Sequence, residues 1–158
     1  MLKQMWRAYR KEHELNLYTI GFTKKSAKEF FDLLISNGVK RLIDIRLNNK
    51  SQLAGFAKSE DLQYFLRKIG QIDYVYMPEF APTEELLDGY RNKSVNWTEY
   101  EKQYCKLLAD RKVLVNKDIS IFDNACLLCS EPTAKQCHRR LAAEYIALSN
   151  KELKIIHL

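Results

Sequence analysis

Apolar residues along this chain follow two alternating patterns. Short runs rich in β-branched and aromatic residues, typical of strands, occur at 17–22, 41–46, 73–78, 125–130 and 154–158. Between them lie stretches in which apolar side chains recur every three or four positions, as on one face of a helix. Strands that alternate with such helices form βαβ units. We therefore predict a single α/β domain with a mostly parallel sheet of about five strands and helices on both faces, in a Rossmann-like layering.

The predicted helices have recognisable starts and apolar faces. Ser26 and Glu29 have the spacing of a capping box at the start of the first helix. Thr133 and Gln136 have the same spacing before the last helix, which we predict over 134–149. Four apolar faces are expected to pack on the core: Phe30, Leu33 and Leu34; Leu62, Phe65, Leu66 and Ile69; Trp97, Tyr100, Tyr104 and Leu108; Cys137, Leu141, Tyr145 and Leu148.

Length and composition indicate one domain. The chain has 158 residues and is 46% hydrophobic, which suffices for one core. We predict an N-terminal helical extension over 1–16 and the α/β domain over 17–158. No run of about 18 apolar residues occurs, so neither export nor membrane insertion is expected, and the predicted location is the cytoplasm. The four cysteines are expected to be reduced thiols.

The formal net charge of +6 favours anionic partners, which are nucleic acid, nucleotides or phosphorylated small molecules. Lys and Arg are spread along the chain, so the charge does not choose among these classes. The sequence identifies neither a cofactor nor an oligomeric state.

Polar and reactive residues collect where the predicted strands end. In open α/β sheets the ligand binds beyond the carboxyl ends of the strands. The residues at or just after these ends are Gly21 and Thr23, Asp44 and Arg46, Glu79, Cys129 and Glu131, and His157. We therefore expect a pocket at this edge of the sheet.

Asp44 and Arg46 lie two residues apart on one face of the second strand. Charged groups in a central parallel strand are costly unless they are paired or functional. One interpretation is a buried ion pair that joins the strand to a helix. In the other, Asp44 is a general base and Arg46 binds an anion.

Cys129 precedes a loop and a helix N-terminus, where a thiol pKa can be lowered or an anion held. A phosphatase loop would need arginine six residues later, but that residue is Lys135. Rhodanese-like sulfur transfer is disfavoured because Pro132 lacks an N–H.

Cys126 and Cys129 have an odd separation and point to opposite faces of a strand, so no metal site is predicted. Cys126 and Cys137 are expected to pack in the core.

The start of the last helix carries further candidates. His138 is either a partly buried histidine bonded to backbone or a proton-transfer group. Arg139 and Arg140 are either a solvated helix face or, beside Glu131, a bidentate phosphate site. His157, close to the chain end, has the weaker case for a proton-transfer role.

Five segments carry a family resemblance: YTIGFTKKSAKEFFDLL, RLIDIR, IDYVYMPEF, LLCSEPTAKQCHRRLAAEYI and IIHL. In their order and across residues 17–158 they resemble the domain of unknown function 488 family. The most specific part is Cys129, the glutamate two residues later and the Cys-His-Arg motif at 137–139. The resemblance implies a bacterial or archaeal cytoplasmic protein and assigns no reaction. It singles out Gly21, Asp44, Arg46, Cys129, Glu131, Cys137, His138 and Arg139.

The chain departs from that pattern in one loop. Many relatives follow the Asp-x-Arg strand with a proline-containing, arginine-rich loop, whereas this chain reads LNNKSQLAGFAK, with Lys50 and Lys58 as its only charges. If this loop contacts the substrate, this protein belongs to a subgroup that recognises its substrate differently from those relatives.

Three functional hypotheses follow. In the first, the protein is an enzyme acting on a nucleotide, nucleic acid or other phosphorylated substrate. Its acid-base or nucleophilic residues would be Asp44, Cys129, Glu131 and His138; its anion-binding residues Arg46, Arg139 and Arg140; its other pocket residues Gly21, Thr23 and Cys137. In the second, it is a nucleic-acid-binding module without chemistry, with aromatics such as Tyr74, Tyr76, Trp97 and Tyr100 stacking on bases. In the third, Cys129 and Cys137 form a thiol redox or metal sensor.

Overall fold

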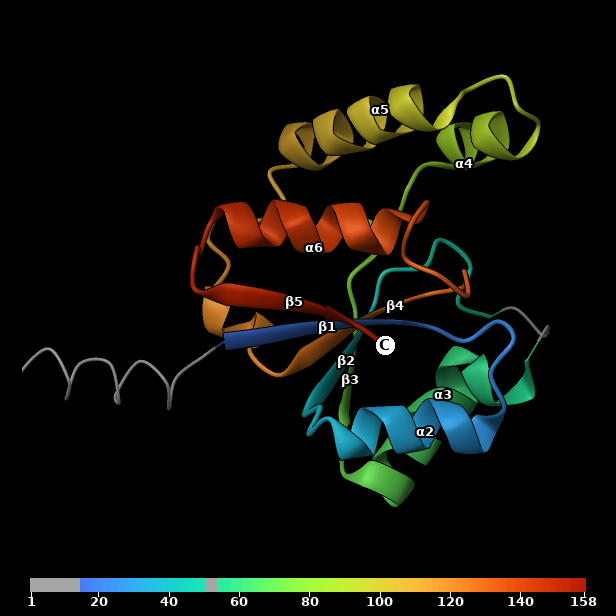
Figure 1. The fold of residues 1–158 in the computed structure, drawn as a ribbon, viewed down its shortest axis with the longest axis vertical. Coiled ribbons are helices and arrows are strands. Elements are labelled where there is room, and N and C mark those ends of the chain that lie inside the picture. The colour runs from blue at the N-terminus through green and yellow to red at the C-terminus, as the bar shows by residue number, and fades with distance from the viewer. Residues whose placement is uncertain (1–14, 51–53) are drawn as a thin grey trace, which may run out of the picture.

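The computed structural model describes residues 15–50 and 54–158, and its centre is a parallel sheet of five strands (Figure 1). The strands are β1 (Leu15–Gly21), β2 (Arg41–Asp44), β3 (Asp73–Tyr76), β4 (Ala125–Cys129) and β5 (Leu153–His157). Their order across the sheet is β3-β2-β4-β1-β5, and every pairing is parallel. This confirms the predicted α/β class. Residues 1–14 of the predicted N-terminal helical extension lie outside the described residues. The prediction is wrong for residues 15 and 16, which are the first two residues of β1.

Helices cover both faces of the sheet, as predicted (Figure 1). On one face lie α2 (Ala27–Ser36) and α3 (Ser59–Phe65). On the other lies α6 (His138–Leu148), with α5 (Trp97–Asp110) packed over it and α4 (Glu84–Arg91) beside α5. The described residues also contain four short helical turns: η1 (Gly55–Ala57), η2 (Leu66–Gly70), η3 (Pro78–Phe80) and η4 (Ile119–Phe122).

Alternation of side chains along the strands builds one apolar cluster on each face of the sheet. Leu17, Ile43 and Leu127 point towards α5 and α6, whereas Leu42 and Leu128 point towards α2 and α3. β4 is buried along its whole length because it lies in the middle of the sheet. The central strands are thus fixed from both sides, and their carboxyl ends are held at defined positions. Among the described residues, no helix is long and apolar enough to cross a membrane.

The start of α2 follows the prediction and the start of α6 does not. Ser26 is the N-cap of α2, and its Oγ accepts a hydrogen bond from the Glu29 amide. The capping box predicted at Thr133 and Gln136 is wrong, because α6 begins only at His138. Residues 131–137 form a loop whose Glu131 carbonyl is bound by the side chain of Arg139, and Cys137 is extended, with φ −141°.

Two apolar residues predicted on buried helix faces are exposed. Ile69 is 51% exposed because the segment after α3 is a π-helical turn, whose wider turn moves this side chain off the buried face. Leu148 is 79% exposed at the last residue of α6, beyond the end of the sheet-facing stripe.

Candidate functional site

The carboxyl end of β4 is the point where the connections of the sheet diverge. β4 leads to α6 on one face, while its neighbours β1 and β2 lead to α2 and α3 on the other face (Figure 1). Gly21 pairs with Cys129 and Asp44 with Leu128, so these three strand ends lie side by side. Such divergence leaves room beyond the strands, which is where α/β proteins bind ligands.

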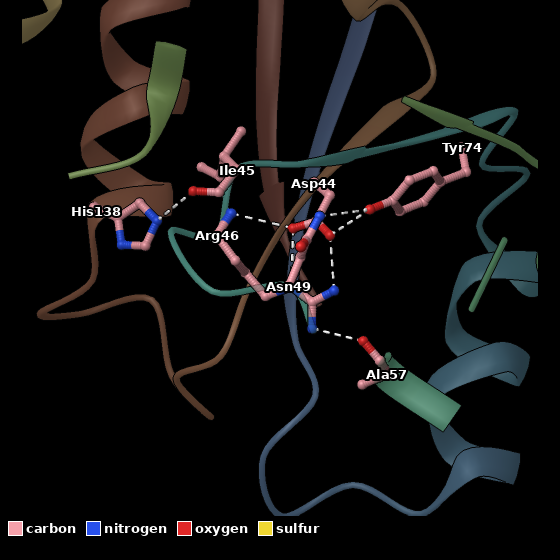
Figure 2. A network of polar contacts seen from close by, with 7 residues as sticks. All are labelled: Asp44, Ile45, Arg46, Asn49, Ala57, Tyr74 and His138. Carbon is pink, nitrogen blue, oxygen red and sulfur yellow. Dashed lines mark hydrogen bonds and ion pairs between the residues drawn. The ribbon is translucent and has the colours of Figure 1, made fainter. Parts of the chain in front are cut away.

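Asp44 and Arg46 form a buried ion pair at the end of β2 (Figure 2). Arg46 Nε donates to Asp44 Oδ1 at 2.9 Å and Nη2 donates to Oδ2 at 2.7 Å, while the two side chains are 0% and 2% exposed. Arg46 Nη1 donates to the carbonyl oxygen of Ala57 at 2.7 Å, which ties the strand end to η1. The guanidinium and carboxylate thus satisfy each other, as in the ion-pair interpretation.

Tyr74 completes this network from the edge strand β3. Its hydroxyl donates to Asp44 Oδ2 at 2.7 Å and accepts a longer bond from Asn49 Nδ2 at 3.4 Å (Figure 2). Burial, followed by the hydrogen bond to Asp44, raises the pKa of Tyr74. The phenol therefore stays protonated and acts as a donor to the carboxylate.

Cys129, Cys137 and Arg139 form a second buried cluster between β4 and α6. The two Sγ atoms are 2.8 Å apart, and Arg139 Nη1 donates to Cys129 Sγ at 3.1 Å. Burial raises the pKa of Cys129, but the Cys137 hydrogen bond and the Arg139 charge outweigh it and hold that pKa below its ordinary value. Burial and the neighbouring Cys129 raise the pKa of Cys137.

Arg139 is a buried connector, not part of a solvated helix face. Only 1% of this residue is exposed. Its Nη1 also donates to the Glu131 carbonyl, and its Nε donates to Thr19 Oγ1 at 3.2 Å. Thr19 Oγ1 lies 2.7 Å from His157 Nδ1, so His157 belongs to this network through Thr19.

Gly21 is required where β1 passes under this cluster. A Cβ at this position would lie 1.6 Å from the Glu131 carbonyl oxygen and 2.6 Å from Arg139 Nη1. No side chain fits there without moving the loop after β4. The absence of a side chain at Gly21 thus allows the contact between Arg139 and the Glu131 carbonyl.

His138, the first residue of α6, bonds to the backbone of the loop after β2. Its Nε2 lies 3.1 Å from the carbonyl oxygen of Ile45 (Figure 2). Burial lowers the pKa of His138 to about 4, with a further contribution from the Arg139 charge, so the ring is neutral at pH 7. Because a carbonyl oxygen only accepts, the neutral ring carries its proton on Nε2. Nδ1, which faces away from Ile45, is left as an acceptor (Figure 2).

A cleft of about 550 Å³ opens beside His138. Its walls come from the loop after β2, from α4 and the start of α5, and from the loop between β4 and α6. The lining includes the basic side chains of Arg46, Arg91, Lys93 and Lys135, the aromatic rings of Tyr90, Trp97 and Tyr100, and one carboxylate, Glu131.

The aromatic wall is ordered by contacts among its rings. Trp97 and Tyr100 are stacked, with centroids 5.2 Å apart and an interplanar angle of 17°. Tyr90 meets Trp97 edge-on at 5.6 Å and donates to Gln136 Oε1 at 2.9 Å across the cleft. The guanidinium of Arg140 lies 5.8 Å from the Trp97 ring centroid. The wall therefore presents fixed rings with positive charge around them.

The predicted residues divide into those on the cleft surface and those behind it. Arg46, Glu131, Cys137 and His138 line the cleft, whereas Asp44, Cys129 and Arg139 are buried beneath it. Arg140 pairs with Glu101 at 2.7 Å beside the aromatic wall. Three others do not line the cleft. Thr23 is exposed, and its amide donates to the Ser130 carbonyl; Glu79 pairs with Lys117 at 2.9 Å; His157 contacts Thr19, which links it to Arg139.

Arg91 and Lys93 are cleft residues that sequence reasoning missed. Arg91 is the last residue of α4 and Lys93 follows two residues later, far in sequence from the strand ends, and no spacing links them to those ends. Their position depends on how α4 packs on α5 through Tyr90, Trp97 and Tyr100. Residues 15–50 and 54–158 contain no group of three or more His, Cys, Asp or Glu side chains placed to hold a metal ion.

These features define an α/β protein with one parallel sheet and a basic, aromatic cleft at its carboxyl edge. The chain belongs to the family described as domain of unknown function DUF488, which matches residues 26–146. This match confirms the resemblance seen in the sequence and covers Asp44, Cys129, Glu131 and the Cys-His-Arg motif. No curated protein and no solved structure matches the chain.

Proposed function

We propose that this protein is an enzyme acting on a nucleotide or another phosphorylated substrate with a planar ring, bound in the cleft beside His138. The observation that carries the proposal is that one cleft combines free cationic side chains, ordered aromatic rings and a neutral histidine. Each of these features corresponds to one part of such a substrate or of its reaction.

The phosphate would be held by the cationic rim. Within the described residues, no carboxylate lies within ion-pair distance of Lys93 or Lys135. Cys137, the N-cap of α6, gives no side-chain cap hydrogen bond, so the N-terminus of this helix, with its positive dipole end, borders the cleft without a capping side chain. Positive charge on the rim and the positive dipole end of the helix together favour a phosphate group.

The planar ring would lie on the aromatic wall. Tyr90 and Trp97 are the partly exposed rings of the cleft, with Tyr100 buried behind them, and stacking of a base on such a ring is worth about 1–3 kcal/mol. Trp97 and Tyr100 hold each other in a stacked arrangement, so little conformational freedom would be lost on binding.

His138 would accept a proton from the reacting group or from water. Its Nε2 proton is held by Ile45, which leaves Nδ1 as the basic atom. A bound phosphate brings negative charge towards the ring and raises its pKa from about 4 towards the working range of a general base. Asp44 and Arg46 support this residue from behind, by fixing the strand end that carries the Ile45 carbonyl (Figure 2).

The test is a turnover screen with a matched variant. We expect purified protein to convert at least one member of a mixture of nucleotides and other phosphorylated compounds with a planar ring, as followed by mass spectrometry. His138→Gln, whose amide can still donate to Ile45, should lose at least 100-fold in turnover while binding is retained. Lys28→Gln, on α2 on the opposite face of the sheet, is the control and should keep full turnover.

A second candidate, a nucleic-acid-binding module without chemistry, is favoured by one specific observation. The charged groups of Asp44, Arg46 and Arg139 all form hydrogen bonds within the protein, so they are engaged in its structure. The side chains left in the cleft are mainly ones that can bind a ligand. Salt-sensitive binding of single-stranded oligonucleotides, with no turnover of any substrate in the screen, would support this candidate over the enzyme.

A further inference from the structure

Two of the four cysteines differ from the others in their surroundings. Cys129 and Cys137 touch each other through their sulfurs, 2.8 Å apart, and Arg139 donates to Cys129. Cys126 is buried among apolar side chains, and burial raises its pKa. Cys105 is half-buried in α5 and its pKa is also raised, first by burial and then by Glu101.

The contacts assign different protonation states to the two neighbouring sulfurs. Cys129 accepts from the Arg139 guanidinium, which favours the thiolate. Cys137 lies against this sulfur and supplies the proton of the S–H···S contact. The pair is thus a nucleophile next to a protonated thiol, which is the arrangement of a reactive and a resolving cysteine.

The pair is also adjacent to the cleft. Cys137 contributes to the cleft wall, and Cys129 lies directly behind it. A molecule as small as hydrogen peroxide would approach the two sulfurs from this side. Exchange of the disulfide with a small thiol would take place at Cys137, the sulfur nearer the cleft.

We propose that Cys129 and Cys137 form a peroxide-reactive dithiol that closes to a disulfide. The Cys129 thiolate attacks one oxygen of hydrogen peroxide, the O–O bond breaks, and a sulfenic acid forms while the other oxygen leaves as hydroxide, which takes a proton from solvent and becomes water. The Cys137 sulfur then attacks the sulfenic sulfur, the S–S bond forms, and the second oxygen leaves as water with the thiol proton. In total the thiolate–thiol pair loses two electrons and one proton, solvent supplies the second proton, and one peroxide becomes two waters. A small thiol reductant restores the dithiol by exchange.

Oxidation would also change the cleft. The two cysteines bracket residues 130–136, and this loop supplies Ser130, Glu131, Pro132, Thr133, Lys135 and Gln136 to the cleft wall. A disulfide removes the thiolate that Arg139 binds and joins both ends of the loop covalently. A change in ligand affinity on oxidation therefore rests on the proposed function, whereas formation of the disulfide does not.

The experiment treats the full-length native protein with one equivalent of hydrogen peroxide, quenches it with acid and alkylates it under denaturing conditions. Peptide mass spectrometry should find one disulfide, between Cys129 and Cys137, with Cys105 and Cys126 alkylated. Dithiothreitol should restore four alkylated cysteines. In Cys137→Ser, a dimedone adduct should appear on Cys129 at least ten times faster than on Cys105 in the same chain.

Three results would overturn the proposal: no disulfide in the native protein, a disulfide that involves Cys105 or Cys126, or equal oxidation rates at Cys129 and Cys105. The native protein itself gives the first two results, so the test does not depend on whether the serine variant folds. Because no cleft ligand is used, these results are independent of the proposed enzyme activity. A variant with Cys105→Ser should still form the disulfide and serves as the matched control.

Discussion

At the scale of single residues, Gly21 has less room for a side chain than any other glycine of the chain. The atoms above it are a backbone carbonyl and a buried guanidinium, neither of which is the loose end of a flexible side chain. Gly21→Ala should destabilise the protein by about 3 kcal/mol, because the loop after β4 must move and Arg139 must give up its contacts. Urea unfolding measures this loss. Gly55→Ala is the control, since a Cβ there meets open space, and an equal loss in both variants would contradict the account.

The ion pair of Asp44 and Arg46 gives a second prediction at this scale. Asp44→Asn keeps the shape but leaves a buried guanidinium without its counter-charge, which should cost about 3–5 kcal/mol of folding free energy. Asp110→Asn removes a solvent-exposed partner of Lys106 and should leave the urea midpoint unchanged. If both variants unfolded at the same midpoint, the Asp44 carboxylate would not be buried and paired as described.

The neutral state of His138 predicts a pH dependence of stability. Its pKa is about 4 in the folded protein and near 6.5 in the unfolded chain, so the unfolded state binds more protons between these values. The contribution of neutral His138 to the free energy of unfolding should be complete above pH 6.5. It should fall as the pH drops towards 4, by about 1–2 kcal/mol at pH 5.

His157, whose pKa is also lowered by burial, acts in the same direction, so the comparison must be made with His138→Gln. Urea midpoints measured from pH 7.5 to 4.5 should fall less steeply in this variant than in the native protein. If the urea midpoints of the two proteins fell equally with pH, the pKa of His138 would be the same in the folded and unfolded states.

At the scale of elements, the sequence predicts each strand because the strands are short apolar runs of the right composition. The strand bounds differ by one to two residues at their ends: β2 ends at Asp44, for instance, because Arg46 turns back to pair with it. The start of α6 was predicted four residues too early. It depends on Arg139 holding the Glu131 carbonyl, a contact between a helix and a loop that no local spacing reveals.

The π-helical turn after α3 leads to a prediction for that element. Leu66 is buried in the apolar cluster on the α2 and α3 face of the sheet, whereas Ile69, three residues later, is exposed to solvent. Leu66→Ala should therefore cost about 2–5 kcal/mol, and Ile69→Ala should leave the urea midpoint nearly unchanged. A large loss for Ile69→Ala would mean that α3 continues as a regular helix and buries both residues.

At the scale of the whole molecule, the strand-end rule located the cleft but not its full lining. Arg46, Glu131, Cys137 and His138 follow strands or begin the helix after one, so their convergence can be predicted from the sequence. Arg91 and Lys93 reach the cleft only because aromatic contacts dock α4 on α5. The split between cleft surface and buried support, with Asp44 and Arg139 in the second group, likewise required the packed structure.

The central claim is that the cleft binds a phosphorylated compound with a planar ring, and Trp97 provides a direct measurement. With Trp6→Phe, Trp97 is the single tryptophan, and it lies in the cleft wall. Titration of its fluorescence should show that AMP binds at least tenfold more tightly than adenosine. Lys135→Gln should remove most of this difference, and Lys28→Gln should not. Equal binding of AMP and adenosine, or an AMP affinity that is unchanged in Lys135→Gln, would contradict the account.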